Sequence, residues 1–166
     1  MSTPITRSAG AVRFKGLASR KCLLIGWMIS WAAFTYASAA LRWLQTGGMN
    51  AAGDLRRTSG AIFAVADHIP PHAKILFGVM FLALLLVLPG AFRSRRHTAM
   101  GMAAGMVAAT VSLCIAPFDY FAGGWGSFLL NEGVTATAPH VLIGLGAGLV
   151  WAFARARCER QSEVNQ

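Results

Sequence analysis

Four long blocks of uncharged, mostly apolar residues dominate the chain, and short polar stretches separate them. A helix needs about 20 consecutive apolar residues to cross the roughly 30 Å of hydrocarbon in a bilayer. The blocks have about this length and lack the alternation of apolar and polar residues that marks membrane-barrel strands. Because backbone in lipid must bond internally, the pattern predicts four transmembrane helices, over residues 22–41, 75–92, 98–118 and 137–154.

A shorter amphipathic segment follows the first block. Arg56 and Arg57 fall on one side of this segment when it is drawn as a helix, and apolar residues share another side. A basic amphipathic segment is typical of a helix that lies along a membrane surface. We therefore expect a short interfacial helix whose apolar face consists of Leu55, Ile62, Phe63 and Ala66.

The stretch before the fourth block, residues 119–132, is rich in glycine and aromatic residues. Aromatic rings gather at the headgroup level of membranes, so we expect this loop to anchor at the interface. A re-entrant segment that lines a pocket is the alternative. The rings concerned are Tyr120, Phe121, Trp125 and Phe128.

Small residues recur along the third and fourth blocks. Gly101 and Gly105 are one helical turn apart in the third block, as are Gly144 and Gly148 in the fourth. Small residues at this spacing let helix backbones approach closely in membranes. We expect the third and fourth helices to pack through these glycines, either within one chain or between copies.

Composition and charge support a membrane protein and predict its orientation. Of 166 residues, 55% are hydrophobic and 13% are charged, against roughly 25% charged residues in soluble domains. Of the 15 lysines and arginines, 11 lie in the N-terminal segment 1–21, the link after the second block and the tail 155–166. Because basic flanks stay in the cytoplasm, we predict an all-α, four-helix, single-domain bundle in a bacterial inner membrane, with both termini cytoplasmic. Topology and anionic lipids thus explain the net charge of +9 without nucleic acid.

The beginning of the chain has an alternative interpretation. A basic stretch, an apolar run and the small residues Ala37-Ser38-Ala39 resemble a secretory signal peptide with a cleavage site. The preceding segment is long for a signal peptide, and the apolar run is long enough to span the membrane. We therefore expect the first block to be a permanent helix.

The three cysteines are far apart in the sequence. Cys22 and Cys158 flank the first and last blocks, and Cys114 lies within the third block. No CxxC pair is present, so neither a thioredoxin-like motif nor a zinc knuckle is indicated. We expect all three side chains to be inert and apolar.

Residues capable of chemistry gather on the predicted periplasmic side. His72 and His140 each follow a proline near the start of a helix, and these helices run parallel, so the imidazoles are expected at similar depth. Both could ligate a haem iron, or hold a divalent metal with Asp67 or Asp119. Proton relay by His140 with the carboxylates of Asp67, Asp119 and Glu132 is a third hypothesis. Transport of Cu(I) is a further alternative, because thioether and thiol groups are soft ligands for this ion. The residues concerned are Met100, Met102, Met106 and Cys114.

The sequence carries no phosphate-binding loop, no nucleophile elbow and no HExxH motif. No set of motifs identifies a family or a cofactor. We interpret the chain first as a non-enzymatic accessory or scaffold-type membrane subunit, whose partners are lipids and other membrane subunits or further copies of itself. The alternatives are a periplasm-facing haem- or metal-binding protein and a subunit of an oligomeric transporter.

Overall fold

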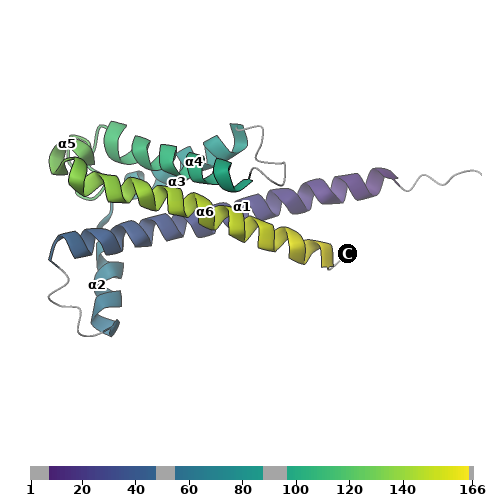
Figure 1. Cartoon of the computed structure of the whole chain (residues 1–166), viewed down its shortest axis with the longest axis horizontal. Helices are drawn as coiled ribbons and strands as arrows, with labels where there is room; N and C mark the ends of the chain where they lie inside the picture. Colours follow the sequence, from purple (N-terminus) through teal and green to yellow (C-terminus); the bar gives the residue numbers. More distant parts are fainter. Residues whose placement is uncertain (1–7, 48–54, 88–96, 165–166) are drawn as a thin grey trace, which may run out of the picture.

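The computed structural model describes residues 8–47, 55–87 and 97–164. Within these ranges the chain is helical and contains no strand, although an isolated bridge pairs Phe118 with Trp125. Figure 1 shows α1 and α6 as two long crossing rods, α3 and α4 beside them, and α2 projecting from the group. The helices are α1 (Ser8–Gln45), α2 (Leu55–His68), α3 (Pro71–Val87), α4 (His97–Thr110), α5 (Phe128–Glu132) and α6 (Val134–Val164), and a π-helical turn (Val111–Ile115) continues α4.

Among the described residues, three helices are long and apolar enough to cross a membrane, and they lie within α1, α4 with its π-helical turn, and α6. Together, α2 and α3 form a fourth candidate span, and the two are bent by 85° relative to each other. The bend falls at Pro70 and Pro71. Pro70 has no backbone N–H to continue the hydrogen bonds of α2, and the fixed φ of Pro71 suits the first position of a new helix.

The helix boundaries differ from those predicted by the apolar blocks. Both α1 and α6 continue well beyond the predicted spans 22–41 and 137–154, because basic and polar residues can also be helical outside an apolar segment. The third span was expected over 98–118, but its helical structure ends at Ile115, shortly before the helix-breaking Pro117. The predicted end of the second span, 88–92, lies outside the described residues.

The contact between α4 and α6 is a close approach of two backbones. A Cβ atom added to Gly101 would lie 2.6 Å from the carbonyl oxygen of Gly148. A Cβ atom added to Gly144 would likewise lie 2.6 Å from the carbonyl oxygen of Gly105. Since no side chain fits in such a gap, glycine is required at these positions. The structure therefore places the four predicted packing glycines in one interface within the chain.

Aromatic side chains join α1 to its neighbours. The indoles of Trp27 and Trp31 donate hydrogen bonds to the carbonyl oxygens of Gly78 and Lys74 in α3, each at 2.8 Å. The rings of Phe34 and Phe77 stack, with centroids 3.7 Å apart. These contacts fill the core between α1 and α3.

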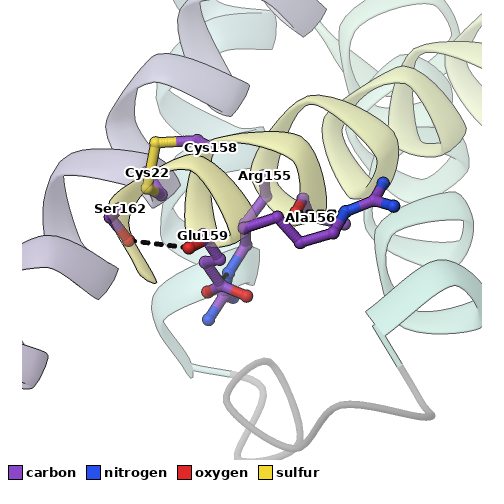
Figure 2. Close-up of a disulfide and its surroundings, with 7 residues drawn as sticks. Cys22, Arg155, Ala156, Cys158, Glu159 and Ser162 are labelled. Atoms are coloured by element: carbon purple, nitrogen blue, oxygen red, sulfur yellow. Dashed lines mark hydrogen bonds and ion pairs between the residues drawn. A yellow bond between two sulfur atoms is a disulfide. The ribbon is translucent and has the colours of Figure 1, made fainter. Parts of the chain in front are cut away.

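A disulfide joins α1 to α6 at one end of the bundle. Cys22 and Cys158 are bonded, with Cα atoms 5.5 Å apart, across the two antiparallel helices (Figure 2). The expectation that these two cysteines are inert is therefore wrong, whereas Cys114 is free. Beside the bond, Arg155 is only 3% exposed, pairs with Glu159 at 2.8 Å and lies over the Trp151 ring. We call this region the disulfide end.

Candidate functional site at the polar end of the bundle

Polar side chains from three helices and one loop gather at the opposite end of the α1–α6 pair. This region, which we call the polar end, includes part of the connection that the sequence predicted to be an aromatic interfacial loop. The connection forms a turn at 119–126 and then the short helix α5, which begins after an N-cap at Ser127. The polar end consists of Arg42, Gln45, Asp119, Asn131, Glu132 and His140.

An ion pair connects α1 to α5. The Nη2 atom of Arg42 lies 2.5 Å from Oε1 of Glu132. The same guanidinium lies over the rings of Phe121 and Phe128, at 5.7 Å and 5.4 Å from their centroids. The hydrogen bond from Arg42 lowers the pKa of the Glu132 carboxyl. The arginine is thus held by a carboxylate and by two ring faces.

Asp119 shapes the loop in which it lies. Its Oδ1 accepts the backbone N–H groups of Phe121 and Ala122 at 2.8 and 2.9 Å, and Oδ2 accepts from Nδ2 of Asn131 at 2.9 Å. An aspartate that bonds the backbone two residues ahead stabilises a tight turn. Gly123 completes this turn with a φ of +70°, a conformation that glycine adopts without strain. The carboxylate is therefore occupied in a structural role.

His140 is fully buried between aromatic rings. Its Nε2 lies 3.2 Å from Oε1 of Gln45, and its ring centroid is 5.0 and 5.4 Å from those of Phe121 and Phe128. Its Nδ1 atom has no hydrogen-bond partner among the described residues, and the same is true of the buried Ser38 hydroxyl. A buried polar atom without a partner costs free energy, so this imidazole is the unexplained group of the polar end.

Tyr120 extends the aromatic cluster toward the core. The residue is fully buried, and its ring meets Phe34 of α1 edge-on, with centroids 5.9 Å apart. Burial raises the pKa of the Tyr120 phenol, because the phenolate would lose its hydration. The phenol is therefore neutral over the physiological range, and the ring acts as a packing element.

The four predicted ligands occupy different surroundings. His72 lies exposed at the start of α3, with its ring edge-on to Phe118 at 4.6 Å, whereas His140 is buried. Asp67 is exposed on α2, and Asp119 is bonded within its loop. No contact recorded for the described residues joins His72 to His140, and these residues contain no group of three His, Cys, Asp or Glu side chains suited to a metal. A site shared by the two histidines stays a prediction.

Three members of the polar end were missed as site residues: Arg42, Gln45 and Asn131. The sequence did contain an indication that Arg42 has an acidic partner, because Arg42 follows one apolar block and Glu132 precedes another. If the two corresponding helices pack side by side in opposite directions, these block ends lie level and the charges meet. Nothing in the sequence indicated that Gln45 would face His140.

A cleft of about 370 Å³ opens between the polar end and α2. Arg42, His68 and Phe121 line it together with three small or apolar residues. Since the guanidinium is already paired with Glu132, the cleft offers little free charge to a ligand. Within the described structure, the side chains of the polar end pair their charges with one another and hold a loop against α1 and α6.

Comparisons with known proteins do not assign the chain: no protein family, no curated protein and no solved structure matches it.

Proposed function

We propose that the chain is a non-enzymatic accessory or scaffold-type subunit of the bacterial inner membrane. The observation that carries this proposal is the mutual pairing of the charged groups at the polar end. Arg42 pairs with Glu132, and the Asp119 carboxylate is used by its own loop and by Asn131. Groups that are bonded in this way hold the structure rigid, whereas an active site needs groups that can exchange partners with a substrate.

The helix α2 provides the surface on which a partner would bind. It leaves α3 at 85°, so it lies nearly in the membrane plane if α3 stands along the membrane normal. Figure 1 shows α2 projecting from the bundle, with one side against α1. Phe63 is 59% exposed on it, and a Cβ atom at Gly60 would meet nothing within 4 Å. We propose that this helix is the interfacial element and that a second membrane subunit packs on it.

Photo-crosslinking from two matched glycines tests this proposal. A photoreactive phenylalanine fits at Gly60 in α2 and at Gly146 in α6, because a Cβ atom meets nothing within 4 Å at either position. We expect a discrete protein adduct from position 60 in membranes and only lipid adducts from position 146. Lipid adducts alone from both positions would contradict an accessory role that uses α2.

The unpartnered Nδ1 of His140 favours one alternative, a protein that binds haem or metal. An optical spectrum and metal analysis of the detergent-purified protein discriminate between the two functions. The accessory role predicts a colourless, metal-free protein. A Soret band or stoichiometric metal that disappears in His140→Ala would replace the first proposal with the second.

The proposed orientation places both termini, and hence the disulfide end, on the cytoplasmic side, on the strength of the 11 basic residues described above. Thiols in that compartment are kept reduced. Alkylation in intact cells should therefore trap Cys22 and Cys158 as free thiols, with the bond forming once the cells are opened to oxidant. A pair that is fully oxidised inside intact cells would reverse the orientation.

A further inference from the structure

A groove separate from the polar end lies between α1, α2 and α3, beside the α2–α3 bend. Its volume is about 550 Å³. Trp31 and Tyr36 of α1 and Phe63 of α2 supply aromatic walls, while Asp67 of α2 and Lys74 of α3 supply charge. The groove thus combines an acidic side chain, a basic side chain and aromatic rings.

The two charges are held near each other without neutralising each other. The Lys74 ammonium donates to the backbone carbonyl oxygen of Asp67 at 3.3 Å, which keeps it at the bend. The Asp67 carboxylate is exposed, and no ion pair of the described residues involves it. The groove thus presents one cationic and one anionic group on adjoining walls.

Two of the aromatic walls, Trp31 and Tyr36, are residue types that concentrate near lipid headgroups. The Trp31 indole is fixed by its hydrogen bond to the Lys74 carbonyl, and Tyr36 meets Phe63 edge-on at 5.1 Å. Tryptophan and tyrosine concentrate where membrane meets water, because one part of each ring is apolar and another is polar. A bend that turns a helix by 85° belongs at the same level, since the helix can then run along the surface.

An apolar strip continues from the groove along α1. It begins near Ala32, which lines the groove, and proceeds by helical turns toward the disulfide end. The strip consists of Met28, Ile29 and Ile25, which are 59%, 46% and 47% exposed. The charged head of an amphiphilic ligand can therefore lie in the groove while its apolar tail lies along the strip.

We propose that this groove binds a zwitterionic phospholipid, with the phosphate at Lys74, the ammonium group at Asp67 and an acyl chain along the α1 strip. The charge pattern selects this class, because an anionic lipid without an ammonium group would place a negative headgroup beside the Asp67 carboxylate. The ring faces of Tyr36 and Phe63 add a favourable field for the ammonium group. This binding site shares Phe63 with the α2 surface proposed for a partner, and it does not depend on the orientation in the membrane.

Native mass spectrometry of the full chain in detergent tests the proposal, with dioleoyl phosphatidylethanolamine and dioleoyl phosphatidylglycerol as probes. We expect about tenfold tighter binding of the ethanolamine lipid, which corresponds to one charge-assisted contact. Lys74→Gln should weaken both lipids about fivefold to tenfold. Asp67→Asn should weaken only the ethanolamine lipid, so that the preference disappears.

Lys21→Gln is the matched control, because it removes the same charge from an exposed lysine near the disulfide end. Thermal unfolding of each variant shows that the fold is intact. Equal affinities for the two lipids, or equal losses in Lys21→Gln and Lys74→Gln, would overturn the proposal as an unselective lipid shell. Free phosphoethanolamine that competes as well as the intact lipid would overturn it too, because the acyl chain would then contribute nothing.

Discussion

At the disulfide end, α1 and α6 are joined by the covalent bond between Cys22 and Cys158, whereas at the polar end the same helices are joined by hydrogen bonds and ring contacts. Gln45 of α1 reaches His140 at 3.2 Å and the carbonyl oxygen of Ala136 at 3.1 Å. One attachment responds to reductant and is indifferent to moderate pH. The polar end also holds the Arg42–Glu132 ion pair, which responds to pH and is indifferent to reductant.

The difference shows how one helix pair can be fastened by two independent means. Between the two ends, the Ser30 hydroxyl donates to the Ala147 carbonyl oxygen, and Trp151 fills the space against Gly26. The middle therefore keeps α1 and α6 in register even when one end is released. Loss of one attachment should loosen that end locally and leave the other end in place.

The largest expected effect is at the disulfide end. Cys22→Ser should lower the free energy of unfolding by about 2–4 kcal/mol without reductant, because the bond limits the freedom of the unfolded chain. The effect should be at the high end, since the bonded cysteines are 136 residues apart. Chemical denaturation in detergent, with and without dithiothreitol, measures it.

Cys114→Ser is the control for that comparison, because it removes the free thiol without affecting the cross-link. With reductant present, the unaltered chain should unfold like Cys22→Ser. If Cys22→Ser and the unaltered chain unfold alike in the absence of reductant, the bond does not stabilise this end.

A smaller effect is expected at the polar end from Asp119→Asn, at about 1–3 kcal/mol. The new amide keeps an acceptor for the backbone N–H groups of Phe121 and Ala122 but turns a donor toward the Asn131 amide. The reversed pair, Asp119→Asn with Asn131→Asp, restores a donor and a carboxylate and should recover most of the loss. Thermal unfolding of the unaltered chain and of these two variants gives the comparison, and a double variant no better than the single one would refute this pairing.

The smallest effect is expected from the Arg42–Glu132 ion pair, at less than about 1 kcal/mol, because both side chains are partly exposed. The pKa of Glu132 is lower in the folded state than in the unfolded chain. Its contribution is therefore present above the ordinary carboxyl pKa, near 4.3, and is lost as the pH falls through the lower folded value. The ion pair therefore stabilises the folded state at neutral pH.

Unfolding midpoints from pH 7 to pH 3 check this sign, with Glu132→Gln as the comparison. The difference between the variant and the unaltered chain should shrink as the pH falls, and Cys22→Ser should keep a constant difference over the same range. A Glu132→Gln difference that does not change with pH would show that the ion pair is not the source of the pH dependence.

Much of the helical architecture was predictable from local pattern. Apolar block length indicated helices long enough to cross a membrane, and the amphipathic residues 55–66 fall in the observed helix α2. The spacing of Gly101, Gly105, Gly144 and Gly148 also indicated surfaces for close approach, because one-turn spacing depends on sequence alone. The short helix α5 was not predicted, since five residues in a glycine-rich stretch give no periodic signal.

The sequence by itself therefore determined the apolar helices, the small-residue faces and the uneven distribution of charge, since each depends on residues close together in the chain. Only the tertiary structure decided that Cys22 meets Cys158, that Arg42 meets Glu132 and that Gln45 reaches His140. The physical reason is that these pairs are about 90 or more residues apart and become neighbours only because α1 and α6 pack antiparallel. That packing follows from side-chain volumes and backbone contacts summed over the whole bundle, which no single stretch of sequence contains.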